Sequence, residues 1–64
     1  MRVNGETFIM KESCTLLKFL EKRNCVLDRV AVELNGNVVP KTLYESTIIT
    51  NDDTIEIVSF IGGG

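Results

Sequence analysis

The sequence has no histidine and only two cysteines, so the commonest metal ligands and catalytic pairs are missing. Without a histidine or a close cysteine pair, no familiar ligand set for structural zinc can be assembled, and we expect no metal site. Cys14 and Cys25 flank a predicted helix, whose 11-residue spacing would hold them about 16 Å apart. A disulfide tolerates a Cα separation of up to about 7 Å, so both are expected to be free thiols. Neither has a histidine to activate it as a nucleophile.

Long runs of one chemical character are missing as well. No stretch approaches the roughly 18 consecutive apolar residues of a membrane span. The N-terminal MRVNGE has no basic region followed by an apolar segment, as a secretion signal would. The longest basic run is Lys22-Arg23 and the net charge is −2, which gives no electrostatic footprint for a nucleic-acid backbone. We therefore expect a cytoplasmic protein that binds neither nucleic acid nor membrane.

The composition that remains is that of an ordinary folded domain, with 44% hydrophobic and 25% charged residues in 64. A chain of this size buries only about 60% of the surface that its unfolded form exposes, which leaves room for one small core. We predict a single domain over residues 1–64.

Two Asn-Gly dipeptides predict two tight hairpins. Asn-Gly is the pair most favoured in a two-residue type I′ turn, because both central residues must take positive φ. Asn4-Gly5 predicts strands near residues 1–4 and 6–10, and Asn35-Gly36 predicts a second hairpin whose return strand ends at Pro40. The strand before the second turn alternates between one face of Val30, Val32 and Leu34 and another of Ala31 and Glu33.

Between the hairpins, the apolar residues recur at helical spacing and predict an amphipathic helix near residues 15–23. Its apolar side is formed by Leu16, Leu17, Phe19 and Leu20, and its polar side by Lys18, Glu21, Lys22 and Arg23. Ser13 or Thr15 could cap its start. Asn24 can take the left-handed conformation that closes a helix.

The last part of the chain ends in one strand and three glycines. The apolar residues of segment 41–53 recur with no clean period, and Asn51-Asp52-Asp53 predicts a tight turn. The final strand, TIEIVSFI, places Ile55, Ile57 and Ile61 on one side and Glu56, Val58 and Phe60 on the other. Gly62, Gly63 and Gly64 add nothing to a core and are expected to be mobile unless a partner grips them.

These elements can bury their apolar faces together as a mixed sheet wrapped across one helix, an α+β fold. The last strand would then be inserted in the middle of the sheet, beside and parallel to the first. With the helix on one face only, the other face meets water, and Val58 and Phe60 would be apolar and exposed.

The order of elements resembles the β-grasp fold of ubiquitin (ββαβββ, about five strands), and the ending IEIVSFIGGG after an acidic turn is similar to the ThiS family of sulfur carrier proteins of thiamine biosynthesis. The resemblance covers the whole chain, and LNGNVVPKTLY and NDDTIEIV carry it most specifically. One departure is the turn, where the family commonly has Asp-Gly-Asp. If its middle position requires positive φ, Asp52 costs stability that a glycine would not.

The resemblance implies that the protein is a substrate of other enzymes and is itself no enzyme. A ubiquitin-activating-like enzyme would use ATP to adenylate the carboxylate of Gly64, and a sulfur donor such as a cysteine desulfurase would convert it to a thiocarboxylate. Thiazole synthase would receive the sulfur, and no cofactor would be bound by the chain. Three extended residues reach roughly 10 Å, and Gly62 and Gly63 have no Cβ, so a narrow active site can close on their backbone. Val58 and Phe60 would form a partner-binding surface.

Two other classes of function stay open from the sequence. The same activation could serve molybdopterin synthesis, tRNA thiolation or attachment of Gly64 to a lysine, as in ubiquitin. Alternatively, the chain could be a passive β-grasp interaction module whose sheet binds a partner and whose tail is inert. Deleting Gly63 and Gly64 separates the passive module, for which binding should persist, from the carriers.

Overall fold

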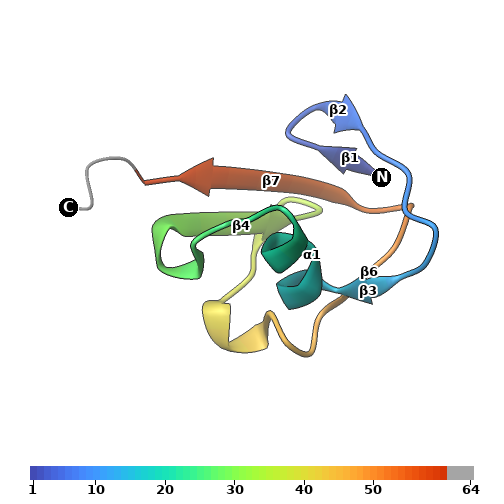
Figure 1. Ribbon diagram of the computed structural model, residues 1–64. Coiled ribbons are helices and arrows are strands. Elements are labelled where there is room, and N and C mark those ends of the chain that lie inside the picture. The colour runs from blue at the N-terminus through green and yellow to red at the C-terminus, as the bar shows by residue number, and fades with distance from the viewer. Residues whose placement is uncertain (61–64) are drawn as a thin grey trace.

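The sheet of this protein lies across a single helix (Figure 1). The computed structural model describes residues 1–60, and the expected mobility of Gly62–Gly64 concerns residues outside that range. Five strands form a mixed sheet in the order β2-β1-β7-β4-β5. They are β1 Arg2–Val3, β2 Glu6–Thr7, β4 Val30–Leu34, β5 Asn37–Val38 and β7 Thr54–Ser59. The mixed sheet on one helix is confirmed.

Both Asn-Gly turns adopt the conformation that their sequence predicts. Asn4 and Gly5 have φ of 51° and 84°, and Asn35 and Gly36 have φ of 52° and 87°. Positive φ at both central residues gives a turn whose twist matches the flanking strands. The β1–β2 and β4–β5 hairpins follow directly.

Strand β7 lies in the middle of the sheet, as the sequence predicts. It runs parallel to β1, with Val3 opposite Ile55, and antiparallel to β4 over five residue pairs, from Val30 opposite Ser59 to Leu34 opposite Ile55. Both of its edges are therefore paired, and the last strand of the chain joins the first hairpin to the second.

Helix α1 spans Leu16–Lys22, and both of its ends are capped as expected. The Thr15 hydroxyl accepts a hydrogen bond from the Lys18 amide at 3.1 Å. Asn24 has φ of 59°, and the Cys25 amide donates back to the Leu20 carbonyl at 3.0 Å. This is the left-handed closure that asparagine tolerates.

The core lies between α1 and the inner face of the sheet. The helix buries Leu16, Phe19 and Leu20, and the sheet contributes buried aliphatic side chains from β1, β4 and β7. The buried residues are Met1, Val3, Leu16, Phe19, Leu20, Val30, Val32, Tyr44, Ile49 and Ile55. Among the described residues, no polar or charged residue is buried.

Three expectations need correction. The second strand, predicted near 6–10, is confined to Glu6–Thr7, because the chain leaves the sheet at Phe8 to reach the helix. The segment without a clean period contains a 3₁₀ helix, η2 Lys41–Leu43, and buries Tyr44. A second, two-stranded sheet of β3 Cys14–Thr15 and β6 Ile48–Ile49 was not predicted, since two residues are too short to show a period.

The acidic turn forms without the penalty considered for Asp52. Asn4, Asn24 and Asn35 are the non-glycine residues with positive φ in the described range, and Asp52 is not among them. The turn closes through the Asp53 amide, which donates to the Thr50 carbonyl at 3.1 Å, and Asp52 donates its amide to the Thr50 hydroxyl at 3.2 Å.

Over residues 1–60, no helix combines the length and the apolar character that crossing a membrane requires.

The side chain of Asn4 extends the pairing between β1 and β7. Its Oδ1 accepts a hydrogen bond from the Ile57 amide at 2.6 Å, and its Nδ2 donates to the Ile57 carbonyl at 3.2 Å. The backbone of β1 has already turned away at this point, so the amide group takes the place of a further strand residue.

Replacing Asn4 tests this clamp. Asn4→Gly keeps the positive φ but removes both hydrogen bonds, whereas Asn4→Ala removes the hydrogen bonds and also strains the turn. We expect Asn4→Gly to lower the free energy of unfolding by about 1 kcal/mol, and Asn4→Ala to lower it by about 2 kcal/mol or more. Urea denaturation measures both. Asn37→Ala, in exposed strand β5, is the matched control and should change stability by less than either; equal losses in all three variants would contradict the clamp.

Candidate functional site

The end of β7 is fixed up to the last residue that the structure describes. Ser59 pairs with Val30, and the Phe60 amide donates to the Arg29 carbonyl at 2.7 Å. The sequence then continues directly into residues 61–64, so only Ile61 separates an anchored backbone from Gly62.

Around this end, the sheet carries exposed apolar side chains. Val58 and Phe60 are each 55% exposed, which confirms the predicted exposure. Val38 on β5 is 70% exposed, but it pairs with Glu33 and so lies nearer the start of β7. Val58 lies opposite Ala31, on the face that α1 does not cover, because the alternate residues Ile55 and Ile57 face the core. That Val58 and Phe60 bind a partner stays a prediction.

Two carboxylates lie next to this apolar surface. Glu33 of β4 is directly opposite Glu56 of β7, and both are exposed. Like charges in directly opposed positions destabilise a sheet. Neither carboxylate belongs to the ion pair found within residues 1–60, which joins Lys41 to Asp28. There, a hydrogen bond from Lys41 and the positive charge of that lysine lower the pKa of the Asp28 carboxyl. The outer face of the sheet around Val58 thus carries apolar side chains and two carboxylates, and Arg2 of β1 lies on the same face beside Thr54.

A hollow of about 360 Å³ adjoins the end of β7. Its charged lining residues are basic, in contrast to Glu33 and Glu56 on the outer face of the sheet. It is bordered by Ser59 and Phe60 on one side and by Arg23, Cys25 and Arg29 on the other. The Arg23 guanidinium lies 5.5 Å from the centre of the Phe19 ring, a cation–π contact that holds it over the helix. Two arginines thus lie near Phe60, the last residue that the structure describes.

The turn before β7 is held by a network of hydrogen bonds around the Asp53 carboxylate. Its carboxylate accepts from the Asn35 side-chain amide at 2.9 Å and from the Thr50 backbone amide at 2.8 Å. The Asn35 hydrogen bond is the largest cause of a lowered pKa of Asp53; burial opposes it, and the Thr50 hydrogen bonds add to it. Asn35 also accepts from the Thr54 amide at 2.9 Å, so its side chain connects the second hairpin to the start of β7.

Sequence reasoning missed the role of the two turn asparagines in holding β7. It assigned Asn4 and Asn35 to their turns because of their φ preference alone. A glycine would satisfy that preference too, so asparagine at both positions was the available signal for side-chain hydrogen bonds.

The remaining candidate residues fall into two groups. Gly62, Gly63 and Gly64 lie outside the described residues. Cys14 and Cys25 are half-buried free thiols that pack against the core at the two ends of α1. Within residues 1–60, no group of three histidine, cysteine, aspartate or glutamate side chains is placed to hold a metal ion.

Comparison with known proteins gives a consistent result. The model of the ThiS family matches residues 2–64. A crystal structure of the thiamine biosynthesis protein ThiS from Geobacter metallireducens superposes with a TM-score of 0.84 at 30% identity, covering 98% of this chain and 96% of that one. The "uncharacterized protein ycf40" of Porphyra purpurea is 34% identical over 64 residues, 100% of this chain and 90% of the relative. A thiazole synthase of Paramagnetospirillum magneticum is 39% identical over 62 residues, 97% of this chain but 19% of that protein.

Asp53→Asn tests the electrostatic part of the turn. Because the pKa of Asp53 is lower in the folded protein than in the unfolded chain, its charge stabilises the fold above the unfolded pKa of about 3.9. That contribution is lost as the pH falls through the lower folded value. We therefore expect the melting temperature of the wild type to fall below about pH 4 more steeply than that of Asp53→Asn.

The control is Asp52→Asn, which removes one charge from the same turn. Within the described part of the chain no hydrogen bond to its carboxylate is found, so the acid dependence of the wild type should be retained. Identical pH profiles for Asp53→Asn and the wild type would contradict the assignment.

Proposed function

The chain belongs to the ThiS family, and we propose that it is a sulfur carrier of thiamine biosynthesis whose reactive group is the carboxylate of Gly64. A ubiquitin-activating-like enzyme joins this carboxylate to the AMP part of ATP and releases pyrophosphate. A sulfur donor, such as the persulfide of a cysteine desulfurase, then attacks the acyl carbon, and AMP leaves. A thiol cleaves the sulfur–sulfur bond of the acyl disulfide so formed, which leaves the thiocarboxylate on Gly64 and oxidises the thiol to a disulfide. The resulting thiocarboxylate delivers sulfur to thiazole synthase.

The observation that carries this proposal is the match over residues 2–64, which includes the glycines, to a family with the same β-grasp fold. The geometry supports it, because the strand before the glycines is paired on both edges and its end is held by the Phe60–Arg29 hydrogen bond. An anchored strand end followed, after Ile61, by three residues without Cβ suits a group that must enter another protein's active site. The chain thus acts as a co-substrate and performs no catalysis itself.

The relatives that are named thiazole synthase support the proposed partner. A segment similar to this chain makes up 19% of one such protein and 20% of another, from Magnetococcus marinus. In those proteins a domain of this kind and a synthase share one polypeptide, which keeps a carrier at high effective concentration near the enzyme that uses its sulfur.

The surface around Val58 and Phe60 is the part of the described chain that is best suited to binding this partner. Exposed apolar side chains that lie next to a strand end can contact a partner while the glycines enter its active site. Interfaces of this kind are dominated by a few buried apolar or aromatic residues, and Phe60 is the aromatic residue nearest the tail.

The decisive test of the proposal is the intact mass of the protein. After incubation with ATP, a ubiquitin-activating-like enzyme from the same genome, a cysteine desulfurase with cysteine, and a thiol reductant, we expect a gain equal to the replacement of one oxygen by sulfur. Fragmentation should place it on Gly64. An alanine added after Gly64 displaces the reactive carboxylate and is expected to abolish the gain. Full conversion of that extended variant would contradict the proposal.

The proposed docking surface has its own test. In the double variant Val58→Thr, Phe60→Ser, we expect binding to the activating enzyme or to thiazole synthase to weaken about tenfold or more. Because both side chains are about half exposed, thermal stability should change little. Isothermal titration calorimetry measures the affinity, and Ile48→Thr, 58% exposed on the small sheet, is the control that should bind as the wild type does. Equal affinities for all three proteins would remove Val58 and Phe60 from the interface.

A further inference from the structure

The hollow of about 360 Å³ at the end of β7 lies where the described chain meets its last four residues. Ser59 and Phe60 form one side of this hollow, and the Phe60 amide is fixed to the Arg29 carbonyl at 2.7 Å. Residues 61–64 follow directly in the sequence. The segment that leaves the strand therefore starts at the rim of the hollow.

The charge of this hollow is positive. Arg23 and Arg29 both line it, and no acidic side chain is among the described residues that do so. Asp28, which precedes Arg29 in the sequence, is paired with Lys41 instead. Within residues 1–60, neither arginine has a carboxylate at ion-pair distance. On a protein with more acidic than basic residues, the hollow thus offers two guanidinium groups to an anion.

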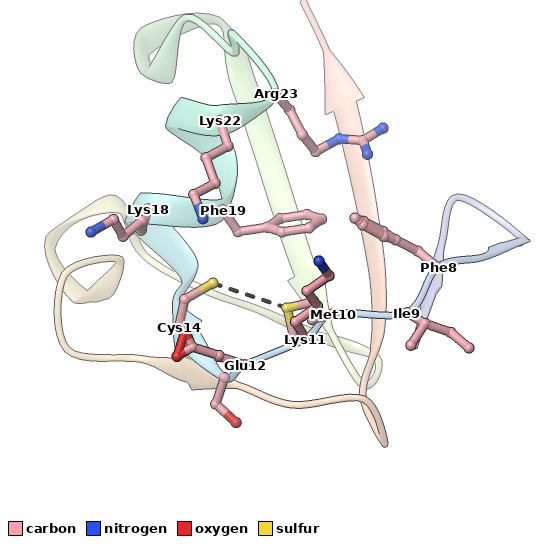
Figure 2. A pocket seen from close by; sticks show the side chains of 11 residues that line it. Phe8, Ile9, Met10, Lys11, Glu12, Cys14, Lys18, Phe19, Lys22 and Arg23 are labelled. Atoms are coloured by element: carbon pink, nitrogen blue, oxygen red, sulfur yellow. Dashed lines mark hydrogen bonds between the residues drawn. The ribbon is translucent and has the colours of Figure 1, made fainter.

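Contact with an aromatic ring orients Arg23. Its guanidinium carbon lies 5.5 Å from the centre of the ring of Phe19, which is buried. Figure 2 shows both side chains at the pocket of about 580 Å³ between segment 8–14 and α1, which Arg23 also borders, and shows Lys18 extending to the other side of the helix. A guanidinium group that stacks on a ring still donates hydrogen bonds from its edge.

The last four residues bring one anion to this place. Under the proposed function, Gly64 is the carboxyl end of the chain, and its carboxylate is the only charged group in residues 61–64. Four residues span at most roughly 13 Å, so the carboxylate always stays near the rim of the hollow. Glycine adopts φ of either sign without strain, which allows the segment to reverse its direction within these few residues.

The short connection makes a weak contact effective. An exposed pair of arginine and carboxylate contributes little between separate molecules, although the guanidinium group can hold both oxygens at once. A short linker, however, keeps the tethered group at an effective concentration in the millimolar range. Ile61 adds apolar surface, and Val26 at the hollow is 58% exposed. The C-terminal segment thus complements the hollow in charge, in apolar surface and in reach.

We propose that this hollow is a binding site for the C-terminal segment of the same chain, residues 61–64, with the Gly64 carboxylate paired to Arg23 and Arg29. The free carrier then exchanges between a docked state and a released state. Only the released state can enter another protein's active site, so docking lowers the apparent affinity for the activating enzyme by the fraction of chains that is docked.

The first test removes the charge of Gly64 and keeps the length of the chain. We compare the whole protein ending in the Gly64 carboxylate with the same protein ending in the Gly64 carboxamide. In side-chain NMR spectra at low salt, the Nε–Hε signals of Arg23 and Arg29 should differ between the two forms. The difference should shrink in about 1 M salt, where exposed charges are screened. Arg2 is the internal control, because it lies on β1 and donates to the Gly5 carbonyl at 2.6 Å. Its signal should be the same in both forms.

The second test removes the arginines. In Arg23→Gln, Arg29→Gln, the heteronuclear NOE of the Gly63 and Gly64 amides should fall below its wild-type value, because the segment loses its docking site. The matched control is Lys11→Gln, Lys18→Gln, which removes the same charge from exposed side chains outside the hollow and should leave this NOE as in the wild type. Thermal melting confirms that both variants are folded.

Three results would overturn the proposal. The first is identical Arg23 and Arg29 signals in the carboxylate and carboxamide forms. The second is a loss of the NOE in the lysine control as large as that in the arginine variant. The third is equally tight binding of inorganic phosphate to both forms, since a docked carboxylate must compete with added phosphate. That result would make the hollow a site for anions from outside the chain.

This inference rests on the proposed function for the free carboxylate of Gly64, yet the two fail in different experiments. The NMR comparisons need no partner enzyme. Unchanged arginine signals together with the mass gain on Gly64 would reject the docked state alone. Absence of the mass gain would reject the carrier function, whatever the arginine signals show.

Discussion

The structure depends on the insertion of β7 between β1 and β4. This strand is the last in the sequence, yet it supplies the only pairing between the two hairpins within residues 1–60, through a parallel contact on one edge and five antiparallel pairs on the other. Neither hairpin has enough paired neighbours to be stable by itself. The sheet, the core against α1 and the fixed position of Phe60 therefore form together, and the element that precedes the glycines is the one on which the fold depends.

Side-chain amides complete this insertion where the backbone cannot. Directly after the strands beside β7, Asn4 and Asn35 each make two side-chain hydrogen bonds to β7 or to the turn before it. Asn51, in that turn, makes two to the Met10 backbone. An amide carries a donor and an acceptor on one planar group, so it can imitate a peptide unit. Three such contacts allow a small chain to satisfy backbone groups that longer strands would otherwise pair.

Local patterns in the sequence predicted most of this fold, and tertiary contacts explain the rest. The Asn-Gly turns, the Thr15 and Asn24 caps and the alternation in β4 and β7 depend on φ preference and period, which are local properties. The β3–β6 pair and the burial of Tyr44 depend on where α1 packs, and two-residue strands show no period. At the site, the exposure of Val58 and Phe60 followed from alternation. The hydrogen bonds from the Asn35 side chain to Asp53 and Thr54 did not, because they join residues that are 18 and 19 positions apart in the sequence.

The two faces of the molecule differ in charge in a way that bears on how a carrier exchanges partners. Around Val58 the surface is apolar and acidic, with Glu33 opposite Glu56 at a cost to stability. Beside the helix it is apolar and basic. A partner with a basic interface is attracted to the first face and repelled from the second, and an acidic one behaves in the opposite way.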